Sequence, residues 1–292
     1  MQLLARSLMF VPGHRRPMVE KALGMRALDV AIFDLEDGAP PAEKDAARGV
    51  LADALGLDGA ARPARFVRVN PVASEHFAQD VAAVVCPGLR TIVLPKIDRA
   101  ADVATAERVV AGYEREAGIA AGSVRFIASI ESALGLLNAY AIATASPRIA
   151  GVLFGAEDYA NDLGLPAGRE GEASRLLQPR ATVVVAATAA RVPAFDGIWP
   201  DIRDGEGLRR DSAVGRQLGF SGKSLIHPGQ IDVINEAFTP SAADVEAARR
   251  VVAAFEAAEA RGEGAVALDG RLVDRPIVER ARRVLRAWEL AR

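Results

Sequence analysis

Several features are scarce in this 292-residue sequence, and each scarcity excludes a class of protein. The single cysteine, Cys86, allows no internal disulfide, and no cysteine pair exists to bind a metal or carry redox chemistry. No uninterrupted apolar run is long enough to span a bilayer, which argues against a membrane protein. The formal net charge is −2, so the overall charge gives no reason to expect binding to nucleic acid or an acidic membrane surface. We therefore expect a protein of the reducing cytoplasm.

The apolar N-terminal segment could be mistaken for an export signal. Arg6 interrupts it and Pro12-Gly13 end it, whereas a signal peptide has a longer apolar stretch and a small-residue cleavage site. We expect a buried strand here instead.

Eight short apolar runs alternate with longer helix-like segments. Most are continuous rather than alternating in hydrophobicity, as in strands of a parallel sheet that helices cover on both faces. The runs lie at residues 6–11, 30–35, 65–70, 91–96, 124–130, 149–154, 192–198 and 224–227. Eight β-then-α units of this length predict a (β/α)₈ barrel over residues 1–240, with a doubly wound open sheet as the alternative.

The placement of polar residues favours the barrel, because barrel enzymes carry their sites at the C-terminal ends of the strands. The residues at or just beyond those ends are Glu36, Asp37, Arg68, Lys96, Glu131, Glu157, Asp158 and His227.

The pattern changes after Pro240. We predict a C-terminal helical extension over residues 241–292, with one helix in the Ala/Glu/Arg-rich segment 242–261, a loop containing Gly262 and Gly270, and a last helix after Pro276. An extension this small is expected to bury no core of its own, so it must pack on the barrel or on a neighbouring subunit.

Two acids, Glu131 and Asp158, follow neighbouring apolar runs. Either one alone could cap a helix or pair with a surface arginine. Their matched placement favours a Mg²⁺ site, because Mg²⁺ is held by one or two carboxylates with water and substrate oxygens at the other positions.

Arg68 interrupts a β-branched apolar run in Phe66-Val67-Arg68-Val69-Asn70. A buried guanidinium needs an anion, so Arg68 meets either a ligand in a pocket or a structural carboxylate, for which Glu36 and Asp37 are the candidates.

Seven short blocks occur in an order and spacing that resemble one known family. They are Arg6-Ser7-Leu8-Met9-Phe10-Val11-Pro12-Gly13, Asp34-Leu35-Glu36-Asp37 followed by Lys44, Arg68-Val69-Asn70, Pro95-Lys96, Glu131-Ser132-Ala133, Phe154-Gly155-Ala156-Glu157-Asp158-Tyr159, and Gly222-Lys223 before Ile226-His227-Pro228. From about Arg6 to Asp274 the chain is similar to the citrate lyase beta-subunit, malyl-CoA lyase and citramalyl-CoA lyase family of the HpcH/HpaI aldolase superfamily. The resemblance implies a (β/α)₈ TIM barrel assembled as a homotrimer or hexamer.

The resemblance also assigns roles to individual residues. It makes Glu131 and Asp158 the Mg²⁺ ligands, Arg68 a substrate contact, and Glu36 and Asp37 acids near the metal through water. The residues it places against coenzyme A or the substrate are Phe10, Lys21, Ile226 and His227, with Arg16 as a phosphate contact. His227 has a second interpretation, an imidazole held by backbone groups at a strand end. For Lys96 we expect a structural ion pair rather than Schiff-base chemistry.

Residues 270–276, Gly-Arg-Leu-Val-Asp-Arg-Pro, resemble the C-terminal lid of malyl- and citramalyl-CoA lyases. In that family the lid aspartate completes the site of a neighbouring subunit, which implies that Asp274 is a catalytic acid acting in trans. Asp274 is equally well placed to be the N-cap of the last helix, and one residue can do both.

The function we expect is Mg²⁺-dependent cleavage or formation of a 3-hydroxyacyl-CoA, giving an acyl-CoA and a 2-oxo acid, with thioesterase activity as an addition. The alternatives are the citryl-acyl-carrier lyase subunit of a citrate lyase complex and a non-catalytic CoA-binding or assembly protein. The sequence does not separate malyl, methylmalyl, citramalyl and citryl esters. Pro179, before Arg180, departs from the commonest sequence of the family at the helix that shapes the acyl pocket.

Overall fold

The computed structural model describes residues 5–56, 63–166 and 176–290. The chain forms two compact units, Met1–Ile234 and Asn235–Arg292. Their boundary falls inside helix α11 (Ile231–Phe238), a few residues before the predicted position at residue 240.

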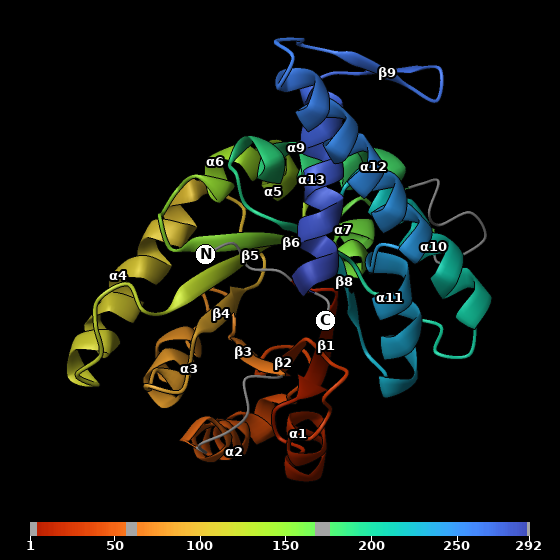
Figure 1. The fold of residues 1–292 in the computed structure, drawn as a ribbon. Helices are drawn as coiled ribbons and strands as arrows, with labels where there is room; N and C mark the ends of the chain where they lie inside the picture. The colour runs from red at the N-terminus through yellow and green to blue at the C-terminus, as the bar shows by residue number, and fades with distance from the viewer. Residues whose placement is uncertain (1–4, 57–62, 167–175, 291–292) are drawn as a thin grey trace. The chain divides into compact units, whose positions relative to one another are not determined.

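The first unit is a closed barrel of eight parallel strands in the order β1 to β8, each hydrogen-bonded to the next, with β8 returning to β1 (Figure 1). The prediction of a (β/α)₈ barrel is confirmed. The strands are β1 (Ser7–Pro12), β2 (Val30–Asp34), β3 (Ala64–Arg68), β4 (Thr91–Leu94), β5 (Arg125–Ile130), β6 (Ile149–Phe154), β7 (Ala194–Asp196) and β8 (Gly222–Leu225).

Helices surround these strands on the outside of the barrel, as Figure 1 shows. Among the described residues they are α1 (Arg16–Leu23), α2 (Lys44–Gly56), α3 (Phe77–Val84), α4 (Ala100–Glu116), α5 (Ala133–Leu137), α6 (Ala139–Ala143), α7 (Ala156–Asp162), α9 (Leu177–Ala189) and α10 (Gly205–Leu218), and the 3₁₀ turns η1 (Pro41–Glu43) and η2 (Pro228–Gln230) lie between the elements. No helix among the described residues is long and apolar enough to cross a membrane.

Apolar side chains fill the interior of the barrel, and this packing is what makes the strands continuous apolar runs in the sequence. The buried cluster consists of Ala5, Leu8, Val30, Ile32, Phe66, Val93, Ile127, Leu153 and Phe195, one or two residues from most strands. The interior is therefore a packed core, so a site is expected at the ends of the strands.

The second unit contains α12 (Ala242–Glu259), a two-stranded antiparallel hairpin of β9 (Val266–Leu268) and β10 (Arg271–Val273), and α13 (Arg275–Leu290). We predicted a loop where the hairpin lies, and that prediction is wrong. Asp269 and Gly270 form the two-residue turn with φ of 50° and 74°. This left-handed backbone at both positions is what tight hairpin turns need, and Asp-Gly supplies it readily.

The expectation that the extension buries no core of its own is also wrong. Phe255 of α12, Val273 of β10 and Val278 of α13 are buried together, with Val251, Val252, Val266, Leu268 and Ile277 packed around them. The two helices and the hairpin thus share a small apolar cluster within the unit.

Candidate active site

A cavity of about 310 Å³ lies where the strands of the barrel end on their C-terminal side. Its lining residues come from the last residues of β1, β2, β3, β6 and β8 and from the segments that follow β2, β5, β6, β7 and β8. The charged ones are Asp34, Asp37, Arg68, Glu131, Glu157 and Asp158, and the apolar side includes Phe10, Leu153, Phe154, Ile198 and Ile226. Acids, one arginine and apolar side chains thus line a space large enough for a small ligand.

Arg68, the last residue of β3, is held in a fixed orientation. Its Nε and Nη2 donate to the two carboxylate oxygens of Asp34 at 2.8 and 2.7 Å, and its Nη1 forms an ion pair with Glu36 at 3.0 Å. The guanidinium lies over the ring of Phe10, 4.6 Å from its centroid. Burial alone would lower the pKa of Arg68, but the charge and hydrogen bonds of Asp34 and the charges of Glu36 and Glu131 together outweigh it, so the net shift is upward and Arg68 is a permanent cation at the cavity wall.

Asp34 was missed as the partner of Arg68, for which we had considered only Glu36 and Asp37. The two residues are opposite each other in the register of β2 and β3. Asp34 also accepts hydrogen bonds from the backbone N–H groups of Glu36 and Gly38, at 2.9 and 2.8 Å. One buried carboxylate therefore fixes both the arginine and the loop that follows β2.

Lys44 supports the same loop from behind. Its Nζ donates to the carbonyl oxygens of Leu35 and Glu36 at 2.6 and 2.8 Å and to the side-chain oxygen of Asn70 at 2.8 Å. Because the lysine donates all its hydrogens to groups of two strand-end loops, it ties these loops together below the cavity.

Glu131 follows β5 and is almost completely buried, with 4% of its surface exposed. Its Oε2 accepts from the backbone N–H of Lys96 at 3.2 Å. A glycine is required opposite it, because a Cβ at Gly155 would lie 2.3 Å from Glu131 Cγ. The Phe154-Gly155-Ala156 segment thus leaves room for the glutamate to reach the cavity.

Asp158 lies in the first turn of α7, next along the barrel from Glu131, and its side chain is 39% exposed. Between the acids lies Lys96, whose Nζ is 2.6 Å from Glu36 Oε1, 3.5 Å from Asp37 Oδ2 and 4.0 Å from Asp158 Oδ1. Although burial opposes it, the hydrogen bond with Glu36 raises the pKa of Lys96. A lysine held protonated in ion pairs is a poor nucleophile, which agrees with the structural role expected for Lys96.

Two carboxylates of this group, Glu131 and Glu36, have a raised pKa, mainly because they are buried. Burial raises the pKa of Glu131 to about 8; Arg68 opposes this shift, and the charges of Glu36 and Asp158 add to it. Burial likewise raises the pKa of Glu36, and Arg68 and Lys96 offset part of it. The ionised form of a buried acid is unfavourable when other acids surround it, and a further cation bound nearby stabilises that form.

The donor set fits Mg²⁺. Among residues 5–56, 63–166 and 176–290, no group of three or more acidic, histidine or cysteine side chains is arranged to hold a metal. A pair of carboxylates that opens on a cavity is what Mg²⁺ uses, since it keeps several water or substrate oxygens.

The structure brings together only part of the predicted site. Phe10, Arg68, Glu131, Asp158, Asp37 and Ile226 line the cavity, whereas Glu36 lies behind Arg68 and Lys96. Arg16, Lys21 and His227 are exposed and are not among the described residues that line it.

Three of the predicted site residues, Arg16, His227 and Asp274, have contacts outside the cavity. Arg16 pairs with Asp53 at 2.5 Å, and His227 accepts a hydrogen bond from the backbone N–H of Gly229 at 3.0 Å, as in the second interpretation of this histidine. Asp274 belongs to the second unit, where it precedes α13 and its carboxylate is 3.4 Å from the backbone nitrogen of Ile277, in the capping position.

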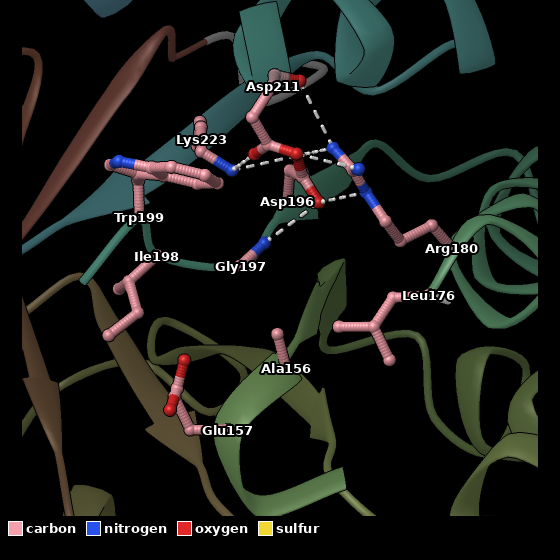
Figure 2. Close-up of a pocket in the computed structure, with 10 residues that line it drawn as sticks. All are labelled: Ala156, Glu157, Leu176, Arg180, Asp196, Gly197, Ile198, Trp199, Asp211 and Lys223. Carbon is pink, nitrogen blue, oxygen red and sulfur yellow. Dashed lines mark hydrogen bonds and ion pairs between the residues drawn. The ribbon is translucent and has the colours of Figure 1, made fainter. Parts of the chain in front are cut away.

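A second group of charges beside the cavity was not predicted. Figure 2 shows Arg180 and Lys223 on opposite sides of Asp196 and Asp211. Arg180 pairs with Asp196 at 2.5 Å and with Asp211 at 2.9 Å, and Lys223 with the same two acids at 3.0 and 2.6 Å. The sequence signal was Arg180, a charged residue in the largely apolar helix α9, because a buried charge requires partners.

This group fixes the segment after β7, which forms one wall of the cavity. Asp196 accepts from the backbone N–H of Gly197 at 3.0 Å, and Ile198 then faces the cavity. Gln230 links this segment to the one after β8, donating to the carbonyl of Trp199 at 2.8 Å and accepting from the N–H of Ile226 at 3.1 Å. The aliphatic wall is therefore held by a buried hydrogen-bonded frame.

Comparisons with known proteins agree with this geometry. Residues 6–228 match the HpcH/HpaI aldolase/citrate lyase family model. The chain is 39% identical to the citrate lyase subunit beta of Leuconostoc mesenteroides subsp. cremoris over 283 residues, which cover 97% of this chain and 93% of that relative. It is 36% identical to a (3S)-malyl-CoA thioesterase of Cereibacter sphaeroides over 287 residues, which cover 96% of this chain and 93% of that relative. The crystal structure of the protein CitE from Mycobacterium tuberculosis in complex with magnesium, acetoacetate and coenzyme A has a TM-score of 0.80, at 33% identity over 99% of this chain and 100% of that one.

Proposed function

The chain belongs to the HpcH/HpaI aldolase/citrate lyase family, and from this premise we propose that it is a Mg²⁺-dependent carbon–carbon lyase acting on the CoA thioester of a 3-hydroxy acid. The products of cleavage are an acyl-CoA and a 2-oxo acid. One observation carries the proposal: Glu131 and Asp158 open on the same cavity as a permanently charged arginine.

Glu131 and Asp158 would hold the metal, with Asp37 on the cavity rim and Glu36 behind it. When bound there, Mg²⁺ supplies electrostatic stabilisation of negative charge on the substrate's carboxylate and hydroxyl oxygens. Arg68 cannot lose its proton, so it stabilises the enolate oxygen of the thioester fragment as that charge develops. Asp34 and Phe10 orient the guanidinium before the substrate arrives.

The proton transfer is assigned to Asp274, which protonates the enolate carbon in cleavage and removes the methyl proton in condensation. The remaining contacts, to coenzyme A, are assigned to Arg16, Lys21, Ile226 and His227. Exposure of the three polar side chains suits an anionic, flexible ligand that stays partly in solvent.

The test is a product screen with purified protein, MgCl₂ and malyl-, methylmalyl-, citramalyl- and citryl-CoA, in which free 2-oxo acid and free thiol are measured separately. We expect 2-oxo acid from at least one ester and loss of turnover in EDTA. Asp158→Asn should abolish the Mg²⁺-dependent turnover, whereas Asp162→Asn, on the same helix and able to keep its hydrogen bond from the N–H of Ala133, should retain it. Activity that survives EDTA would overturn the metal mechanism.

A second candidate is the citryl-acyl-carrier lyase subunit of a citrate lyase complex. It is favoured by the 39% identity to a citrate lyase subunit beta across nearly the full length of both chains. This candidate predicts co-purification with a carrier protein and a transferase from the native source, and a higher kcat/KM for the carrier thioester than for the CoA thioester. Thiol release without oxo acid would instead indicate thioesterase activity, which the malyl-CoA thioesterase relative supports.

We further place the protein in the cytoplasm as a homotrimer or hexamer in which Asp274 acts on a neighbouring subunit. The cytoplasm suits the single cysteine, and cell fractionation tests it. Support for the lid comes from the motif around Asp274.

Asp274→Asn separates the two roles of this residue, because asparagine caps helices as well as aspartate. If Asp274 transfers the proton, the variant should keep its stability and lose on the order of 10²–10⁴-fold in kcat. Mixing Asp274→Asn chains with Asp158→Asn chains under subunit exchange then tests the geometry. Recovered activity means that an intact metal site and an intact lid come from different chains; mixed assemblies that all stay inactive mean that the lid serves its own chain.

A further inference from the structure

Lys96 contacts every carboxylate of the proposed metal site. Its ammonium is 2.6 Å from Glu36, 3.5 Å from Asp37 and 4.0 Å from Asp158, and its backbone N–H donates to Glu131 at 3.2 Å.

The backbone of Lys96 adopts a conformation that is rare for lysine. Its φ is 51°, in the left-handed region that glycine and, less often, asparagine occupy. In this conformation the amide and the ammonium of one residue reach the same group of acids. Strained backbone of this kind persists only where surrounding contacts over-determine it, and it is concentrated at functional sites.

We propose that Lys96 is a built-in counter-cation that opposes Mg²⁺ binding and thereby sets the metal affinity of the site. Without metal, the ammonium neutralises the charge of Glu36 and also part of the negative charge of Asp37 and Asp158. Divalent metal then binds against the positive charge of Lys96. The inference rests on the proposed function, because it takes Glu131 and Asp158 as the ligands.

The sign of the effect follows from Coulomb's law. Removing a unit positive charge that lies 4.0 Å from a ligand oxygen strengthens the attraction of the remaining acids for a divalent ion. Since the Lys96 side chain is 40% exposed, solvent screens part of the effect, and we expect a gain in affinity on the order of tenfold.

Lys96→Met removes the charge while keeping the backbone N–H that holds Glu131. The variant and the wild type, both stripped of metal, are titrated with MgCl₂ by isothermal calorimetry. Lys96→Met should bind about tenfold more tightly, whereas Lys96→Arg, which retains the charge, should stay within a few-fold of the wild type. Arg90→Met serves as the matched control, because Arg90 is an exposed cation at the other end of β4 and its loss should leave the affinity unchanged.

Unchanged or weaker Mg²⁺ binding by Lys96→Met overturns the proposal. If that variant does not fold, Lys96→Gln repeats the test with a side chain that can still hydrogen-bond Glu36. Asp158→Asn separates this failure from a failure of the proposed metal site. When Asp158→Asn binds Mg²⁺ as the wild type does, the site itself is misplaced; when it loses binding but Lys96→Met is unaltered, only the role of Lys96 is wrong.

Discussion

The substitution Arg68→Lys keeps the positive charge at the cavity wall but removes the planar fork. Arginine at this position makes two charge-assisted hydrogen bonds to Asp34, an ion pair with Glu36 and a stacking contact with Phe10. A single ammonium cannot satisfy both oxygens of Asp34 and also reach Glu36. With each charge-assisted bond contributing about 1.5–3 kcal/mol, we expect a loss of about 2–3 kcal/mol in the free energy of unfolding.

The effect on catalysis should be larger than the effect on stability. A lysine drawn towards Asp34 no longer presents a positive charge where the enolate oxygen develops, so kcat and kcat/KM should fall together by roughly 10²–10³-fold. Thermal unfolding and steady-state kinetics of the same preparation give both numbers, the first as a decrease in Tm of roughly 5–10 °C.

Arg148→Lys is the matched control for this prediction. Arg148 donates to both oxygens of Glu114 at 2.8 and 2.6 Å and lies 5.8 Å over the ring of Phe126, but it precedes β6 and so belongs to the opposite end of the barrel. It should lose comparable stability and keep its kcat. If Arg68→Lys behaves like this control, with near-normal kcat, Arg68 is a structural residue and the catalytic assignment fails.

Three further substitutions test other parts of the structure. The pKa of Glu114 is lowered to about 2, because hydrogen bonds from an arginine and two backbone N–H groups outweigh its burial. Relative to a pKa of about 4.3 in the unfolded chain, this lowered pKa contributes roughly 3 kcal/mol to the free energy of unfolding. The contribution is present above about pH 4.5 and is lost as the pH falls towards 2. In urea titrations Glu114→Gln should therefore be less stable than the wild type at pH 7 and should lack this loss of stability in acid. Gly155→Ala should push Glu131 away and weaken Mg²⁺ binding in calorimetry, while Gly49→Ala, where a Cβ meets nothing within 4 Å, should not. Because Lys96 has a φ of 51°, Lys96→Gly should be about 1 kcal/mol more stable than Lys96→Ala in urea unfolding, and equal stabilities would contradict the assigned strain.

The barrel could be predicted from the sequence because its strands are buried on both faces. Each strand then appears as an unbroken apolar run, and runs such as 30–35 and 149–154 coincide within a residue with β2 and β6. The hairpin of the second unit could not be found in this way. Its strands have three residues each, which is too short for the alternation of hydrophobicity to be recognised, and only Asp269-Gly270 marks the turn.

The acids of the candidate site could be predicted for a related reason. Glu131 and Asp158 follow strands that are neighbours in the barrel, so chain order alone places them close together. The partner of Arg68 required more information. Asp34 faces Arg68 only because of the register between β2 and β3, and register is set by packing that the sequence does not display.

We predict that the charge of the cavity controls the order in which its ligands bind. Among the described residues that line it, Asp34, Asp37, Glu131, Glu157 and Asp158 are acids and Arg68 is the single basic residue, already paired with Asp34. The proposed substrate, a thioester of a hydroxy acid, carries a carboxylate and phosphates, so the acidic charge that Lys96 and Arg68 leave unneutralised should repel it until a further cation binds. Mg²⁺ should therefore bind before the substrate, and the free carboxylate of a 2-oxo acid should bind measurably only when the metal is present. Calorimetric titration of pyruvate into the protein with and without MgCl₂ tests this order, and equal affinity under the two conditions would show that the acid-rich lining does not control entry.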